Sequence, residues 1–202
     1  QLAILKPITK AQFRPAQASD IYPTIRRALG LARSGTPGPV AVEISANHYF
    51  LTQELGELEW SVAPPTPAGP AASLVEEAAR LLAQAKHPAL YLGNGARGAA
   101  AHLVELAERL GVPVTTTIQG KGVFPENHPL WLWPGFGPMA PGFAKSIMDR
   151  CDVLLAIGVR FSEVATGSYG LTPPANLIHV DINSEVFSRN YPARLAIESD
   201  AA

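Results

Sequence analysis

The sequence of 202 residues contains a single cysteine, Cys151. One thiol cannot form an internal disulfide or a metal site built from several cysteines, and sparse cysteine is typical of a reducing compartment. Long apolar runs are absent too, since no stretch reaches the ~18 residues that a membrane-spanning helix needs. We therefore expect a cytoplasmic protein with neither disulfides nor a membrane span.

The sequence also lacks an excess of charge of either sign. Sixteen Lys and Arg residues balance 17 Asp and Glu residues, which gives a net charge of −1. Nucleic-acid binders carry basic patches, so we predict no nucleic-acid partner. The five histidines lack the spacing of metal ligands, such as H-x-x-x-H, so we predict no metal site. The 47% of hydrophobic residues excludes a disordered chain.

The chain is predicted to contain the end of one domain followed by a complete second domain. Apolar residues recur at helical spacing over 19–33, and 39–44 has the pattern of a strand, whereas 1–18 is irregular. One helix and one strand cannot bury a core alone. The proline-rich segment 57–70 predicts a stiff linker. We therefore divide the chain into a domain tail (1–56), a linker (57–70) and a complete domain (71–202).

Within 71–202, helical stripes alternate with short apolar strands. The helices are predicted near 74–85, 103–110 and 143–149, and the strands at 89–92, 112–117, 152–157, 177–182 and 194–197. Residues 118–142 are rich in glycine, proline and aromatic side chains and are predicted to form a long connection. Strands that are apolar on both faces indicate an α/β fold with a Rossmann-like parallel sheet and helices on both faces.

Ligands of open α/β sheets bind beyond the carboxyl ends of the strands, so the loops there are the candidate sites. The first is Gly93-Asn94-Gly95-Ala96-Arg97-Gly98, a G-x-G-x-x-G sequence between a strand and a helix. Such glycines let the backbone approach a pyrophosphate. The carboxylate expected ~20 residues later is missing, however, because that strand ends in Thr117-Ile118-Gln119. A tight turn that needs small residues is the alternative.

Three further loops are candidates at the same edge. Arg160 follows Gly158 and could pair with a phosphate, Asp181 could bind ribose hydroxyls, and the loop 134–138 could cover a flat ring. The alternatives are a surface arginine, a helix cap at Asn183 and a plain surface loop. Cys151 and His179 are predicted to be structural, because each lies at or within an apolar strand.

The loops, taken in order, resemble the central domain of thiamine diphosphate-dependent enzymes, especially acetolactate (acetohydroxyacid) synthase. The matching segments are SGTPGPVAVEI, YLGNG, PVTTTIQGKGVFPENHP, CDVLLAIGVRFSEVATG and NLIHVDINSEVFSRN. The resemblance implies that residues 1–56 are the end of a pyrimidine-binding domain, which agrees with the division above. Gln1 is not a methionine and no signal-peptide pattern follows, so we expect a piece of a longer enzyme.

The resemblance implies a pocket for FAD or ADP in this domain. The implied contacts are Gly93, Asn94, Gly95, Thr117, Ile118, Gln119, Gly120, Gly135, Phe136, Gly137, Gly158, Val159, Arg160, Asp181 and Ile182. The sequence departs from the synthase pattern in four places, one of which is Ser45-Ala46-Asn47-His48 in place of an acidic strand end. Ser162-Glu163-Val164 replaces an Asp-Asp-Arg run, Asn94 replaces a glycine, and Phe136-Gly137 replaces methionine and histidine.

By the same resemblance, thiamine diphosphate and Mg²⁺ bind to other domains of the parent enzyme. None of the aspartates of this chain lies between two glycines, as the metal-binding motif requires, so no catalytic residue is assigned and the chain alone is expected to be inactive. The parent would decarboxylate a 2-oxo acid and join the product to a second one, for branched-chain amino acid biosynthesis or catabolism, as a homodimer or homotetramer. Two alternatives stay open: a spacer in another thiamine diphosphate-dependent enzyme without a nucleotide, and a stand-alone nucleotide-binding module.

Overall fold

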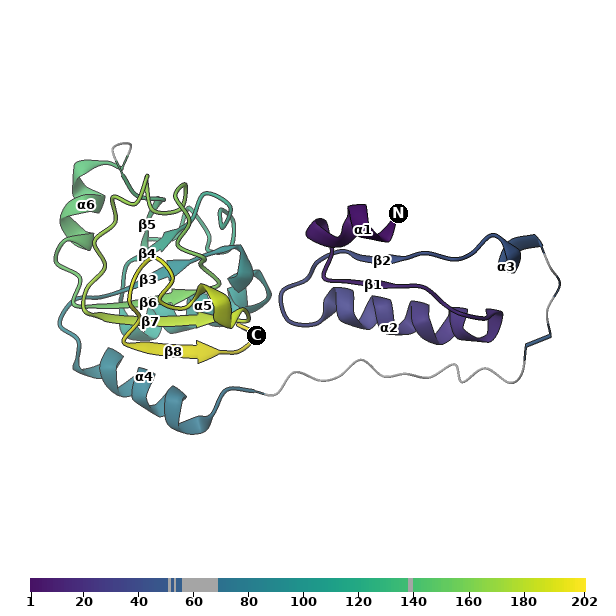
Figure 1. The fold of residues 1–202 in the computed structure, drawn as a ribbon. Coiled ribbons are helices and arrows are strands. Elements are labelled where there is room, and N and C mark those ends of the chain that lie inside the picture. Colours follow the sequence, from purple (N-terminus) through teal and green to yellow (C-terminus); the bar gives the residue numbers. More distant parts are fainter. Residues whose placement is uncertain (51, 53, 56–68, 138–139) are drawn as a thin grey trace. The chain divides into compact units, whose positions relative to one another are not determined.

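The computed structural model describes residues 1–50, 52, 54–55, 69–137 and 140–202 (Figure 1). The chain forms two compact units, Gln1–Thr66 and Pro67–Ala202. Most of the predicted linker 57–70 lies outside the described residues. The boundary between the units falls within that segment.

The first unit contains a small parallel sheet and one long helix. Its elements are α1 (Leu2–Leu5), a 3-10 turn (Lys6–Ile8), β1 (Ala11–Phe13), a second 3-10 turn (Ala18–Asp20), α2 (Ile21–Arg33), β2 (Val40–Val42) and α3 (Asn47–Phe50). β1 pairs with β2, with Ala11 opposite Val40. The expectation that residues 1–18 are irregular was wrong, because β1 pairs with a strand that follows 27 residues later, which local sequence does not reveal.

The second unit is built on a sheet of six parallel strands in the order β5-β4-β3-β6-β7-β8. The strands are β3 (Pro88–Leu92), β4 (Val114–Thr116), β5 (Trp131–Pro134), β6 (Val153–Ile157), β7 (Asn176–Asp181) and β8 (Leu195–Glu198). The helices are α4 (Ala72–Gln84), α5 (Ala100–Leu110) and α6 (Gly142–Met148), with 3-10 turns at Asn94–Ala99 and Ser184–Val186.

The predicted α/β fold is confirmed, with one strand missed. The sequence analysis assigned 118–142 to a connection, but β5 lies within it and pairs with β4. β5 is an edge strand of four residues that ends in Pro134, and proline is tolerated only at such edges. Its two tryptophans and the proline resemble loop composition, which is why sequence alone does not identify it.

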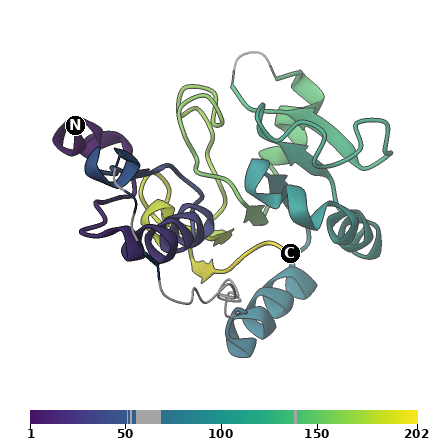
Figure 2. The same cartoon turned by 90° about the vertical axis from the view of Figure 1, so that its right-hand side faces the viewer.

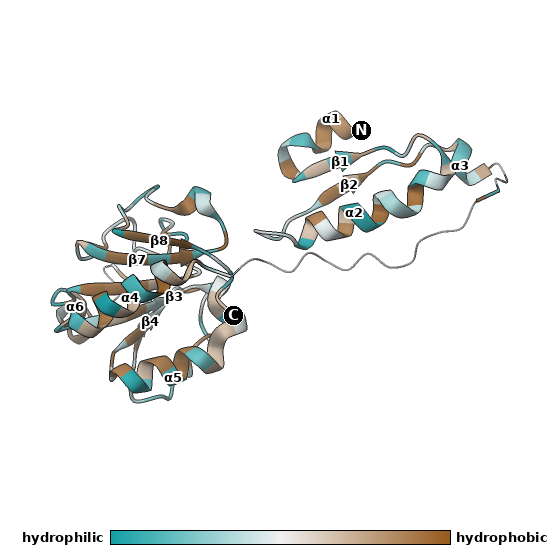
Figure 3. Ribbon diagram, turned by 90° about the horizontal axis from the view of Figure 1, so that it is seen from below, coloured by the Kyte–Doolittle hydropathy of each residue, from teal (hydrophilic) through white to brown (hydrophobic). Residues whose placement is uncertain are grey.

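Apolar side chains alternate between the two faces of the sheet and form two cores. On one face, Leu90 and Leu92 of β3 and Leu155 of β6 pack with side chains of α4 and α5. On the other face, Tyr91 and Leu154 pack with α6 and with the connections that follow β6 and β7. Figure 3 shows the apolar strands in brown and the mixed colouring of α4 and α5, whose polar sides remain outside. Helices therefore cover both faces, as expected for a parallel sheet.

The strand order reverses between β3 and β6, which are paired neighbours at the centre of the sheet: β4 and β5 are added on one side of β3, and β7 and β8 on the other side of β6. Here the loop after β3 lies directly on the loop after β6. A Cβ atom on Gly93 would lie 1.9 Å from the carbonyl oxygen of Gly158, and one on Gly158 would lie 2.5 Å from the nitrogen of Ala96. Gly158 also has a positive φ of 63°. Only glycine on both sides lets these two backbones touch.

The buried histidine of β7 helps to hold the loop after β6. His179 is 1% exposed, and its Nε2 donates to the carbonyl oxygen of Val159 at 2.7 Å. Its ring lies edge-on to Phe161 and to Phe187, with centroids 5.0 Å away in both cases. Burial lowers the pKa of His179, although the bond to Val159 and the charge of Asp181 act in the opposite direction. The neutral ring is therefore part of the core, as predicted.

We expect the Gly93→Ala variant to lose at least ~3 kcal/mol of stability, because its Cβ would overlap the Gly158 carbonyl. Gly98→Ala is the matched control within the same motif. Its Cβ would meet only the Ala202 side chain at 3.6 Å, so its stability should change by less than ~1 kcal/mol. Urea unfolding measures both. Equal effects of the two substitutions would show that the Gly93–Gly158 contact is not the reason for the glycine.

His179 should make the stability of the fold depend on pH. The unfolded chain binds a proton at this histidine below about pH 6.5, whereas the folded chain, with its lowered pKa, does so only at lower pH. The free energy of unfolding should therefore fall as the pH drops below ~6.5. Urea unfolding at several pH values should show a flatter profile for His179→Gln than for wild type. A His179 pKa at or above 6.5 by NMR would contradict this.

Candidate functional site

The candidate site is the edge of the sheet where all six parallel strands end. Figure 2 faces this edge of the second unit, with the loop after β6 in light green. The predicted site residues occupy five consecutive strand ends: 93–95 after β3, 117–120 after β4, 135–137 after β5, 158–160 after β6, and 181–182 at the end of β7. Topology thus brings all fifteen to the same edge of the sheet, as their pattern predicts.

The glycine loop after β3 uses its amide groups within the protein. The N–H of Gly93 donates to Ile157 at 2.9 Å, that of Gly95 to Gly158 at 3.4 Å, and that of Ala96 to Gly93 at 3.1 Å. A pyrophosphate cradle needs such N–H groups free and pointing at the ligand. The contact with Gly158 therefore explains the glycines as a tight turn, and these three amides do not fit a phosphate.

The loop after β4 folds back onto the end of β3. The N–H of Gly120 donates to Oγ1 of Thr117 at 2.8 Å, and a Cβ on Gly120 would lie 2.6 Å from the carbonyl oxygen of Leu92. Thr117 and Gly120 therefore shape the turn. The side chains between them, Ile118 and Gln119, are exposed, with Ile118 51% accessible. These two are the members of the loop that a ligand can reach.

The loop after β5 packs against β3, β4 and the loop after β6. The N–H of Gly135 donates to Thr116 at 2.6 Å, and the Phe136 ring lies edge-on to Tyr91 with centroids 4.9 Å apart. A Cβ on Gly137 would lie 2.8 Å from the Cα of Gly167, so this turn is in backbone contact with the loop after β6. Pro138, the last member of the predicted covering loop, lies outside the described residues.

Two of the predicted site residues at this edge are charged, the exposed Arg160 and the largely buried Asp181, which is 8% exposed. Arg160 is exposed and makes no ion pair or hydrogen bond within the described part of the chain. Asp181 accepts the N–H of Asn183 at 2.9 Å through Oδ1, while Oδ2 accepts no hydrogen bond from any described residue. A guanidinium suits a phosphate and a carboxylate oxygen suits ribose hydroxyls. Arg160 and Asp181 therefore offer groups that can bind a phosphate and a hydroxyl, and Ile118 offers an exposed apolar side chain.

Two buried groups of the second unit, Tyr91 of β3 and Cys151 just before β6, stay uncharged at neutral pH. Burial raises the pKa of the Tyr91 hydroxyl, which donates to the carbonyl oxygen of Ala165. Burial also raises the pKa of Cys151 to about 12, against smaller opposing effects of its hydrogen bonds. A thiol with that pKa is neither a nucleophile nor a metal ligand at neutral pH. The arrangement can bind an anion, but it offers no proton-transfer pair.

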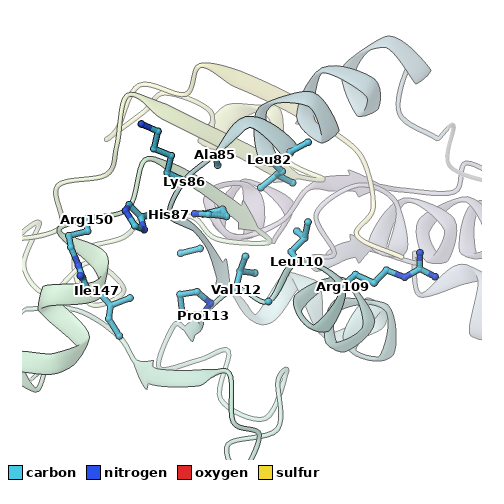
Figure 4. A pocket seen from close by; sticks show the side chains of 14 residues that line it. Leu82, Ala85, Lys86, His87, Arg109, Leu110, Val112, Pro113, Ile147 and Arg150 are labelled. Atoms are coloured by element: carbon cyan, nitrogen blue, oxygen red, sulfur yellow. The ribbon is translucent and has the colours of Figure 1, made fainter.

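The opposite edge of the sheet carries a cavity of about 480 Å³. Figure 4 shows Leu82, Ala85, Leu110, Val112 and Pro113 lining it, with basic side chains around them. Two of these basic side chains, Arg109 and Arg150, lie at the C-terminal ends of helices. The Nε atom of Arg150 donates to the carbonyl oxygen of Ser146 in α6, and Arg109 pairs with Glu105 at 2.8 Å. Cations at helix C-termini stabilise the helix dipole, which gives them a structural role.

The described residues include no cluster of three or more His, Cys, Asp or Glu side chains that could bind a metal ion. Among the helices that the structure describes, none has the length and apolarity to cross a membrane.

Sequence reasoning missed the side chains that hold the loop after β6. Tyr91 looked like an ordinary core residue of its strand, and nothing in the local pattern marks Asn190, which donates to the carbonyl oxygen of Phe161 at 3.0 Å. His179 was assigned a structural role, but its acceptor, Val159, could not be inferred. These contacts join residues 20 to 74 positions apart, so only the folded structure reveals them.

Comparison with known proteins agrees with this architecture. Residues 75–202 match the family model described as the thiamine pyrophosphate enzyme, central domain. The chain is 35% identical over 212 residues to the "probable acetolactate synthase large subunit" of Methanocaldococcus jannaschii, covering 99% of this chain and 35% of that protein. It is 32% identical to the chloroplastic acetolactate synthase 1 of Zea mays, covering 98% of this chain and 32% of that protein.

The structure of benzoylformate decarboxylase from Polynucleobacter necessarius superimposes with a TM-score of 0.76 at 23% identity, over 96% of this chain and 36% of that chain. This likeness concerns the fold. The chain thus spans about a third of the length of the relatives that it matches. On the match of residues 75–202, the chain belongs to the thiamine pyrophosphate enzymes and contains their central domain.

Proposed function

We propose that the chain is the central part of an acetolactate synthase-like enzyme, which decarboxylates a 2-oxo acid and joins the product to a second 2-oxo acid. The identity of 35% to an acetolactate synthase large subunit, extending over 99% of the chain, supports this assignment. Thiamine diphosphate, when bound with Mg²⁺, supplies the chemistry of decarboxylation and carbon–carbon bond formation. The residues of this chain would bind a nucleotide and would pack against the remaining domains of that enzyme.

The division of the chain follows from the same proposal. Residues 1–56 would complete a pyrimidine-binding domain, 57–70 would link it to the central domain, and 71–202 would form the central domain. Among the described positions of the first unit, Ala28 alone belongs to the buried hydrophobic core. The large apolar side chains of Ile4 and Phe50 are exposed. Such a unit needs further strands and helices to cover it. We propose that these come from the remaining domains of the parent, which would form a cytoplasmic homodimer or homotetramer.

We further propose that the central domain binds FAD or ADP at the carboxyl edge of the sheet. The observation that carries this is Arg160, an exposed guanidinium without a protein partner in the described chain, on a loop at the centre of the sheet. Arg160 would hold a phosphate, Asp181 would bind ribose, and Ile118 would contact a ring. The alternative is a spacer domain without a nucleotide. A stand-alone NAD module is disfavoured, because the glycine-loop amides are occupied.

Titration of the chain with FAD, followed by quenching of flavin fluorescence, tests the nucleotide proposal. Binding that ADP displaces and NAD does not would support it. A chain that is folded by circular dichroism and binds neither FAD nor ADP at millimolar concentration would leave the spacer alternative.

The Arg160→Gln variant should weaken FAD binding at least ~10-fold, because a charge-assisted contact to a phosphate contributes about 1.5–3 kcal/mol. Arg150→Gln is the matched control, since it removes the same charge at the opposite edge of the sheet beside the cavity. Its affinity should equal that of wild type. If Arg150→Gln weakens binding and Arg160→Gln does not, the ligand occupies the cavity and the assignment of Arg160 is wrong.

The chain alone should not decarboxylate pyruvate when thiamine diphosphate and Mg²⁺ are added. The sequence has no aspartate between two glycines, and the described residues hold no metal-binding cluster. Pyruvate consumption is the measurement, with a full-length acetolactate synthase as the positive control. Turnover proportional to the concentration of the purified chain would contradict the proposed role.

A further inference from the structure

The loop after β6, residues 158–170, is fastened by side chains from three other parts of the fold. His179 of β7 donates to the carbonyl oxygen of Val159 at 2.7 Å, and Asn190 donates to that of Phe161 at 3.0 Å. Tyr91 of β3 donates to that of Ala165. Loops usually satisfy their carbonyls with solvent or their own backbone. Side-chain donors at three points indicate that this loop is held in one conformation.

The backbone between the first two fastenings has an unusual conformation. Phe161 has a φ of 49°, in the left-handed region that a bulky side chain seldom adopts. Its ring is 2% exposed and lies edge-on to His179 and 5.4 Å from the ring of Tyr191, centroid to centroid. A strained residue persists only where its surroundings enforce it. Here the buried ring and the bonded carbonyl oxygen both do so.

Arg160 lies between the two bonded carbonyl groups. Its neighbours Val159 and Phe161 are 1% and 2% exposed, whereas Arg160 itself is exposed. The peptide unit before Arg160 and the one after Phe161 are therefore hydrogen-bonded to the fold, and the arginine side chain projects from the short segment between them. Anchoring reduces the conformational entropy that a long, flexible side chain loses when it binds a ligand. The fastening thus affects an exposed guanidinium that has no partner in the described chain.

We propose that His179 and Asn190 are positioning residues for Arg160: their hydrogen bonds to Val159 and Phe161 fix the backbone on both sides of the arginine that binds the nucleotide phosphate. The proposal rests on the proposed nucleotide function for the ligand, but the fixed loop is an independent observation. Asn190 is the sharper probe, because its side chain is at the surface and its removal should leave the core intact.

The test compares Asn190→Ala with Asn176→Ala. Asn176 also donates its amide to a backbone carbonyl, that of Asp152 at 3.1 Å, but at the opposite edge of the sheet. Backbone ¹⁵N relaxation gives the order parameter at Arg160, and fluorescence titration gives the affinity for FAD. Asn190→Ala should lower the order parameter from about 0.85 towards 0.6 and weaken FAD binding about 5-fold. Asn176→Ala should change neither.

A second pair of variants tests the histidine. His179→Leu removes the donor, and His179→Gln keeps an amide that can donate to Val159, so Gln should restore the order of Arg160 that Leu loses. If His179→Leu does not fold, the comparison of Asn190→Ala with Asn176→Ala still tests the proposal. An unchanged order parameter in Asn190→Ala would overturn the proposal. Loss of order in Asn190→Ala, together with no FAD binding by wild type, would support the positioning of Arg160 and refute the nucleotide function.

Discussion

The contact between Gly93 and Gly158 sets the arrangement of the whole carboxyl edge. β3 and β6 are neighbours at the centre of the sheet, and chains leaving them turn in opposite directions. In many sheets of this kind a crevice opens at that point. Here the carbonyl oxygen of Gly158 occupies the space where a Gly93 side chain would begin, so the two backbones close against each other. The neighbouring loops are built outward from this contact.

With the crevice closed, the proposed nucleotide contacts come from side chains and not from the backbone of the glycine loop. The amides of Gly93, Gly95 and Ala96 donate to protein carbonyls, so these three N–H groups are not free to bind a phosphate. A side chain such as Arg160 can still bind a phosphate, provided that its own backbone is fixed. The hydrogen bonds from His179 and Asn190 supply that fixation. The packed sheet edge and the fixed position of Arg160 thus both depend on how the loops after β3 and β6 pack against each other.

The sequence pattern predicted what depends on local periodicity. The apolar runs at 89–92 and 152–157 correspond to β3 and β6, and the order of the elements gave the parallel sheet. The pattern did not predict β5, because an edge strand with Trp131 and Pro134 has no strand-like alternation of apolar and polar residues. The motif 93–98 located a sheet edge correctly but left its purpose open, since a glycine that contacts Gly158 and one that contacts a phosphate look alike. Only long-range contacts distinguish the two.

The first unit shows how much a fold depends on elements far along a chain. β1 and β2 form two parallel strands of three residues each, and every residue in them is only half-buried. Parallel strands are ordinarily covered on both faces, and two strands alone are at best marginally stable. The second unit meets that requirement with six strands and two cores. The first unit therefore has the form of a sheet margin, and under the proposed function the other strands and helices of the pyrimidine-binding domain would cover it.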